Sequence, residues 1–200
     1  MTLSKSICTM GHRPGISRDD YRNYYENNHA PLAIRHFPFR RYVRNHLVTE
    51  PDIGFDSISE FWSDDMTAAA ALMEGPIGDV MRADERNFID QPRIAPAGSD
   101  EEILSEGEKT SGDGRRFASL LTFAGDAGPV LRWAKAIAAR MPGVSIDRVT
   151  SWSAEAFPAD AVLWTPERPE VDPPAGVSMR VLEVRRMETP PEVMERARAG

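Results

Sequence analysis

The chain has 200 residues, of which 41% are hydrophobic and 28% charged, and its formal net charge at pH 7 is −7. These values are typical of a soluble globular protein with one domain of ordinary size or two small ones. They argue against a nucleic-acid partner, because the positive charge is nowhere concentrated. They also argue against a membrane protein, because no apolar run approaches the roughly 18 residues that a membrane span requires.

The N-terminal residues lack the apolar segment of a secretion signal, so we expect the fold to begin here. Cys8 is the single cysteine and cannot form an internal disulfide. It lies between Ile7 and Met10 in a probable strand, where a buried thiol acts as a small hydrophobic group. We therefore expect a cytoplasmic protein with an unreactive Cys8.

The first half of the chain predicts the order strand, helix, strand. A strand over about 3–10 ends at the Pro14-Gly15 turn signal. Ser17 and Asp20 then form a variant capping box for a helix over about 18–30, with aromatic residues on one stripe. Because proline interrupts helices, we expect Pro31 to end this one.

Two strand-like segments follow at 39–49 and 55–62, joined by a turn-rich connection of hairpin length at 50–54. Asp64 and Asp65 can cap a second helix, which the Gly75-Pro76 step interrupts before it resumes. A short strand at 93–97 completes a β-α-β-β-α-β order. That order is the ferredoxin-like motif, an antiparallel sheet with both helices on one face.

The second half repeats this order imperfectly. Residues 99–116 combine acidic residues with Ser and Gly and contain only two aliphatic residues, which predicts a linker. Strands are expected at 116–123, 145–152, 160–165 and 178–187, with one helix that begins at Pro129. Four prolines within 166–176 exclude a second regular helix. The predicted domains are therefore 1–98, a linker at 99–116, a degenerate ferredoxin-like module at 117–190 and a tail at 191–200.

Two such sheets that face each other would close an eight-stranded barrel and remove exposed sheet edges. The predicted fold class is thus α+β, with two ferredoxin-like modules in tandem forming a dimeric-type α+β barrel. If the two halves pair within one chain, the protein could be a monomer. If like pairs with like, it is a dimer with two sites, and we expect a homodimer.

Several strings resemble the EthD family in order and spacing: HRPGISRDDYRNYYENNHAPL, RRYVRNH, FDSISEFWSDD and ADERNFID, within residues 10–92. The family consists of dimeric α+β barrel proteins with a Pro-Gly turn and a first helix that ends in His-Ala-Pro-Leu. The resemblance implies a small apolar pocket between sheet and helices, in which one or two histidines or tyrosines move protons. The second half lacks the His-Ala-Pro segment and the second helix, so we expect it to serve as scaffold.

His29 is the leading catalytic candidate. It lies one turn beyond Tyr25 on the inward stripe of the predicted helix, close to the end that Pro31 imposes. There the helix dipole favours the protonated imidazole and burial favours the neutral form, a balance that suits a general acid or base. The alternative is a structural histidine that bonds the carbonyls of the helix end.

Alternation on the next strand places Tyr42 and His46 on one face, roughly 13 Å apart, as the two ends of a small pocket. On the following strand, Asp56 or Glu60 could orient a histidine, and Trp62 could form an aromatic wall. Ordinary cross-strand pairs and a core tryptophan explain each of these residues equally well.

We therefore expect the catalytic residues His29, Tyr42, His46 and Asp56, and the substrate-binding residues Tyr25, His36, Glu60, Trp62 and Phe88. His36 would lie at the rim of the pocket, and His12 in a solvated turn. No metal-binding spacing of His or Cys and no glycine-rich phosphate loop occurs in the sequence, so we expect neither metal nor other cofactor.

The expected function is that of a cofactor-independent lyase, dehydratase or isomerase acting on a small apolar or aromatic catabolic intermediate. His29 would transfer the proton, and Tyr42 or His46 would polarise an oxygen or supply a second proton. Two alternatives stay open: a non-catalytic carrier or accessory protein for a hydrophobic metabolite, and a cofactor-free monooxygenase. One histidine and one tyrosine beside an apolar pocket serve all three.

Overall fold

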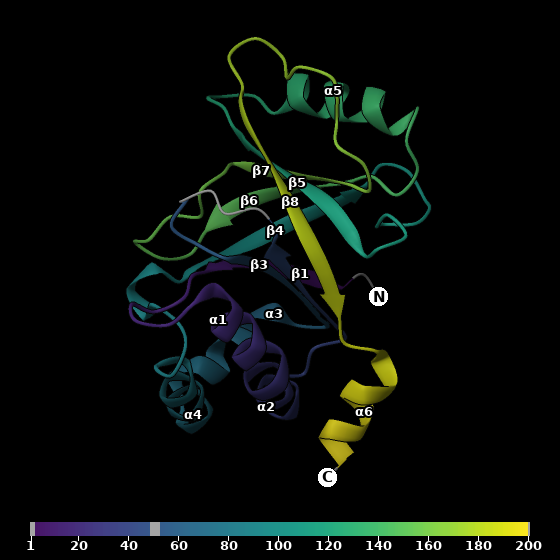
Figure 1. Ribbon diagram of the computed structural model, residues 1–200. Helices are drawn as coiled ribbons and strands as arrows, with labels where there is room; N and C mark the ends of the chain where they lie inside the picture. Colours follow the sequence, from purple (N-terminus) through teal and green to yellow (C-terminus); the bar gives the residue numbers. More distant parts are fainter. Residues whose placement is uncertain (1–2, 49–52, 200) are drawn as a thin grey trace.

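The computed structural model describes residues 3–48 and 53–199 of the chain. Its strands are β1 (Ser4–Met10), β2 (Arg41–Leu47), β3 (Ser57–Ser63), β4 (Ala95–Ile103), β5 (Arg115–Thr122), β6 (Ser145–Ser151), β7 (Ala161–Thr165) and β8 (Ser178–Glu188). They form one closed antiparallel barrel in the order β1-β3-β2-β8-β5-β7-β6-β4 (Figure 1). The connection expected at 50–54 falls largely on residues 49–52, which lie outside the described part of the chain.

The barrel consists of two four-stranded sheets with equivalent strand order. The first half contributes β4-β1-β3-β2 and the second half contributes β8-β5-β7-β6, which is the ferredoxin-like order in each case. The pairs β2–β8 and β4–β6 join the two sheets. The predicted dimeric-type α+β barrel is thus confirmed, and it closes within one chain.

Most helices cover the outer face of the first sheet. They are α1 (Arg18–Tyr24), η1 (Tyr25–His29), α2 (Ala30–His36), α3 (Met66–Ala71), η2 (Leu72–Glu74), α4 (Pro76–Glu85) and the short η3 (Gln91–Arg93). The second sheet carries α5 (Gly128–Ala138) on the opposite side of the barrel (Figure 1). None of the helices in the described ranges is long and apolar enough to cross a membrane.

The first helical segment does not end at Pro31, so that prediction is wrong. α1, η1 and α2 follow one another without a break from Arg18 to His36. η1 is a π-helical turn, in which the Ala30 amide donates to the carbonyl of Tyr25, five residues back. Proline lacks an amide and its ring clashes with the carbonyl four residues earlier in a regular helix, so the wider turn lets the path continue.

Two segment boundaries differ from those expected. β4 continues to Ile103 and β5 begins at Arg115, so only the middle of the expected linker lies outside the sheet. The expected tail folds into α6 (Pro191–Ala199), which packs against α2 and buries Met194. Both boundaries were missed because polar residues dominate these segments, while their few inward-facing side chains carry the packing.

The barrel interior holds a buried ionic network. Nζ of Lys5 lies 2.7 Å from Oδ2 of Asp147, 2.8 Å from Oε2 of Glu60 and 3.0 Å from Oε1 of Glu101. Arg116 forms a second ion pair with Glu60, and its guanidinium lies over the Trp164 ring. Because Lys5 and Glu60 belong to the first half and Arg116 and Asp147 to the second, the network connects the two halves.

Candidate functional site

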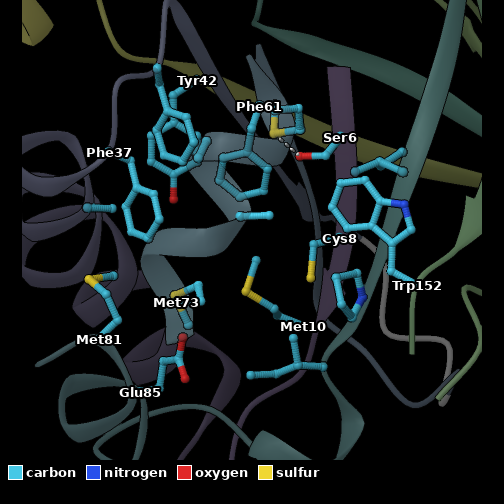
Figure 2. Close-up of a pocket in the computed structure, with 18 of the residues that line it drawn as sticks. Ser6, Cys8, Met10, Phe37, Tyr42, Phe61, Met73, Met81, Glu85 and Trp152 are labelled. Atoms are coloured by element: carbon cyan, nitrogen blue, oxygen red, sulfur yellow. Dashed lines mark hydrogen bonds between the residues drawn. The ribbon is translucent and has the colours of Figure 1, made fainter. Parts of the chain in front are cut away.

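An apolar cavity of about 560 Å³ lies between the first sheet and its helices. Phe37 and Phe61 lie in one part of its wall, and Met73 and Met81 in another (Figure 2). Phe39 also lines the cavity. The volume exists because small side chains face it, among them Ala33 of α2 and Ala69 and Ala70 of α3. Methionine side chains adapt their shape readily, so this wall suits an apolar ligand of irregular outline.

His29 lines this cavity and is 6% exposed. Its Nδ1 lies 2.7 Å from Oδ2 of Asp84 on α4, and its ring packs edge-on against Tyr25. A carboxylate at Nδ1 fixes the neutral ring with the proton on that nitrogen, which leaves the lone pair on Nε2. In this arrangement His29 can accept a proton at Nε2 beside an apolar cavity.

Asp84 supplies the negative charge of this pair. Partial burial would raise its pKa, but hydrogen bonds from His29 and from the Tyr24 hydroxyl, 2.9 Å from Oδ1, outweigh burial and lower the pKa below its usual value. The carboxylate is thus ionised at neutral pH. The sequence analysis missed Asp84, although its place four residues before Phe88 was a usable signal in the sequence. In the structure α4 ends at Glu85, so Phe88 lies just beyond the helix.

Tyr42 also lines the cavity, as expected. Its hydroxyl donates to the Tyr25 hydroxyl at 3.0 Å, which in turn lies 2.8 Å from Oγ of Ser59. Burial raises the pKa of Tyr42 well above its usual value, so the phenol stays neutral and can donate a hydrogen bond. Tyr25 and Phe88 are fully buried behind the wall and pack against His29, so their predicted places as substrate-binding residues are wrong.

Glu85 and Cys8 are further polar groups at the cavity. Oε2 of Glu85 accepts a hydrogen bond from the Gln91 amide at 3.1 Å. Burial raises the pKa of Cys8 to about 12, so its thiol stays protonated. The expected burial of Cys8 is confirmed, and its lack of reactivity stays a prediction. Sequence reasoning gave Glu85 no role, because a single glutamate on an amphipathic helix carries no distinctive signal.

His46 does not reach the cavity, so its predicted place at one end of the pocket is wrong. It shares a face of β2 with Tyr42, but it lies behind the rings of Tyr21 and Tyr25 and is 1% exposed. Its Nε2 lies 2.6 Å from Oε1 of Glu26, while Nδ1 has no hydrogen-bond partner within the described residues. Burial lowers the pKa of His46, so the ring is neutral and donates to Glu26.

Glu26 makes a testable contribution to stability. Burial would raise its pKa, but hydrogen bonds from His46 and Arg44 outweigh burial and lower the pKa to about 2. A carboxylate with a lowered folded-state pKa stabilises the fold above its ordinary pKa, and this effect is lost as the pH falls through about 2.

Glu26→Gln should therefore reduce the free energy of unfolding by about 2 to 3 kcal/mol at pH 7, and by progressively less from about pH 5 downwards. Urea denaturation of both proteins at several pH values measures the difference. Glu74→Gln, at an exposed position in η2, should show none. A deficit that is equal at pH 7 and pH 3 would contradict the assignment.

The other predicted site residues lie away from the cavity. Asp56 does orient a histidine, but this is His12, whose Nδ1 lies 2.7 Å from Oδ2, and Arg18 binds the other oxygen. These residues line a separate hollow of about 230 Å³. His36 is the last residue of α2 and lies outside the cavity wall, so the rim position expected for it is wrong.

Glu60 and Trp62 face the barrel interior, so their predicted places in the pocket are wrong. Glu60 belongs to the ionic network, and Nε1 of Trp62 donates to Oε2 of Glu101 at 2.9 Å. Alternation along β3 turns Phe61 towards the helices instead, where it stacks with Tyr42 at 4.9 Å between ring centroids. Sequence reasoning therefore missed Phe61 because it chose the wrong face of β3.

Among the described residues, no group of three or more His, Cys, Asp or Glu side chains is arranged to hold a metal ion. The expectation that the protein uses neither metal nor other cofactor stays a prediction.

Comparison with known proteins finds a family match in the first half of the chain. Residues 13–92 match the EthD domain. No curated protein matches the sequence. The solved structure of an EthD family protein from Bacillus halodurans C-125 is 22% identical, and the match covers 45% of this chain and 90% of that one with a TM-score of 0.37.

Two further solved structures match nearly the whole chain. An anthrone oxidase-like protein is 8% identical with a TM-score of 0.54, covering 93% of this chain and 92% of its own. A provisionally named monooxygenase from Lactobacillus acidophilus NCFM is 13% identical with a TM-score of 0.53, covering 93% and 94%. At these identities the likeness shows the fold alone. Residues 13–92 thus match the EthD domain, and the whole chain has the dimeric α+β barrel fold.

Proposed function

We propose that the protein is a cofactor-independent acid–base enzyme, of the lyase, dehydratase or isomerase type, acting on a small apolar or aromatic molecule in the cavity. The observation that carries this proposal is the His29–Asp84 pair at the wall of an otherwise apolar cavity. An ionised carboxylate at Nδ1 both fixes the tautomer and stabilises the imidazolium that forms when Nε2 accepts a proton.

Tyr42 complements His29 in this mechanism. Its neutral phenol donates to the Tyr25 hydroxyl in the structure, and on ligand binding it would turn that one proton to a ligand oxygen instead. The apolar surroundings would strengthen the new bond because water does not compete. His29 would then remove a proton next to a carbonyl, while Tyr42 stabilises the negative charge that develops on the oxygen. A cytoplasmic location completes the proposal, and a homodimer is not needed to form the barrel, which closes within one chain.

The proposal can be tested without the natural substrate. 2-Tetralone is a small bicyclic ketone whose protons next to the carbonyl exchange with solvent deuterium once a base removes them. We expect protein freed of metal and flavin to accelerate this exchange, followed by proton NMR in D₂O, by about 10²-fold over imidazole at the same concentration. His29→Ala should abolish the acceleration. Exchange by the wild type at the rate of free imidazole would contradict general base catalysis.

A non-catalytic carrier is the second candidate, favoured by the largely apolar wall of the cavity. In that case, His29→Ala would change the affinity for the ligand, and the wild type would not accelerate the exchange reaction. A third candidate, cofactor-free oxygenation of an activated aromatic, uses the same base and is distinguished by consumption of molecular oxygen.

A further inference from the structure

Trp152 brings the second half of the chain to the cavity of the first half. It directly follows β6, lines the cavity, and is 49% exposed. Figure 2 shows its indole on the side of the cavity opposite Phe37 and Tyr42. The residue comes from the half that lacks the EthD match, so that half contributes directly to the wall of the candidate site.

The backbone around Trp152 is held on both sides. The Trp152 amide donates to the carbonyl of Pro96 on β4 at 3.0 Å. Five residues later, the Phe157 amide donates to Oγ of Ser151 at 3.0 Å, and the Phe157 ring is buried in the barrel interior. The backbone that carries the indole is therefore held in place by hydrogen bonds and packing on both sides.

The absence of a side chain at Gly98 leaves space for the Trp152 ring. A Cβ atom at this position would lie 2.9 Å from Nε1 of Trp152 and 3.1 Å from Cζ2, closer than real Cβ contacts allow. The indole therefore packs directly on the backbone of β4. No hydrogen bond from the indole nitrogen is found within residues 3–48 and 53–199, so packing alone sets the ring position in the described structure.

A half-exposed tryptophan leaves a large apolar surface in contact with water. Covering that surface with a flat aromatic ring recovers its burial and adds a favourable stacking geometry, which an alicyclic ring of the same size cannot provide. Stacking would place the ligand between Trp152 and the Phe37 and Tyr42 side of the cavity.

We propose that Trp152 is the specificity-determining residue of this cavity and selects ligands with a planar aromatic ring. This inference rests on the proposed function only in taking the cavity as the ligand site, and it does not depend on catalysis by His29. It assigns the second half of the chain a role in recognition besides its structural one.

The test compares 2-naphthol with decahydro-2-naphthol, which has the same carbon skeleton and hydroxyl group without aromatic rings. Binding of each is measured by isothermal titration calorimetry to the wild type, Trp152→Leu and Trp152→Phe. We expect 2-naphthol to bind the Leu variant about tenfold more weakly and the Phe variant nearly as well as the wild type. Binding of decahydro-2-naphthol should change by less than about threefold, because Leu keeps an apolar contact.

Two further variants complete the experiment. Gly98→Ala should displace the indole and weaken 2-naphthol binding as Trp152→Leu does, while Met81→Ala, on the α4 wall, should weaken both compounds alike. Equal binding of 2-naphthol to wild type and Trp152→Leu would overturn the proposal, as would failure of the wild type to bind either compound. Trp152-dependent binding without His29-dependent exchange would support this inference and refute only the acid–base function.

Discussion

Replacing Asp84 by asparagine should lower kcat/KM for the exchange of 2-tetralone protons by about 10²-fold or more. The Asn amide can donate to Nδ1 of His29, which would shift the ring proton to Nε2 and remove the lone pair that accepts the substrate proton. Even in the correct tautomer, the imidazolium formed during reaction would lose the carboxylate 2.7 Å away. The rate of deuterium incorporation at several substrate concentrations measures the effect.

Asp84 and His29 act as one unit in this mechanism, so their effects should not add. The double variant Asp84→Asn, His29→Ala should be no slower than His29→Ala alone. Asp19→Asn is a matched control, because it removes one negative charge from an exposed carboxylate on α1. Full activity of Asp84→Asn, with the fold intact by circular dichroism, would show that the Asp84 carboxylate is structural and that catalysis does not depend on it.

The architecture followed from local signals wherever these were specific. The capping box of Ser17 and Asp20 is present, and Asp65 caps α3 as expected. The prolines of 166–176 exclude a helix, and in the structure this segment holds none. The prediction that the helix ends at Pro31 was wrong because the effect of a proline on a helix depends on the helical turn before it. A π turn has no distinctive sequence pattern, so the sequence could not show that the helix continues.

The site could be predicted only in part, because both faces of the barrel strands are buried. Alternation on β2 and β3 correctly separates their faces, but burial does not reveal which face lies under the helices. Register decides this: Tyr42 is directly opposite Phe61, while Val43 is opposite Glu60. The pairing that places Glu60 inside the barrel depends on the tertiary structure and not on the local sequence. The same holds for the contact between Asp84 and His29.

The ionic network of the barrel interior is even harder to predict from the sequence. Lys5 and Asp147 are separated by 142 positions in sequence, and each alone looks like an ordinary polar residue of a strand. Burial raises the pKa of Asp147, whereas the charges of Arg116 and Lys5 outweigh burial and lower the pKa of Glu60. The carboxylates thus depend on the two cations to remain charged inside the protein.

Lys5→Met should for this reason destabilise the fold by about 3 to 5 kcal/mol at pH 7. Methionine fills a similar volume, but it leaves Glu60, Glu101 and Asp147 facing Arg116 alone. The buried negative charge is then uncompensated, and protonation relieves it, so the deficit should shrink as the pH falls towards about 5. Urea denaturation at pH 5 and pH 7 measures both effects.

The outcome also distinguishes a lost charge from lost packing. Adding Asp147→Leu to Lys5→Met should recover part of the stability, because the most deeply buried carboxylate is removed along with its partner. Lys135→Met removes a lysine from an exposed pair with Glu102 and should change the free energy of unfolding by less than about 1 kcal/mol. A Lys5→Met deficit as small as that of Lys135→Met would mean that water or neighbouring groups already neutralise the interior charge. In that case the network would not be what holds the two halves of the barrel together.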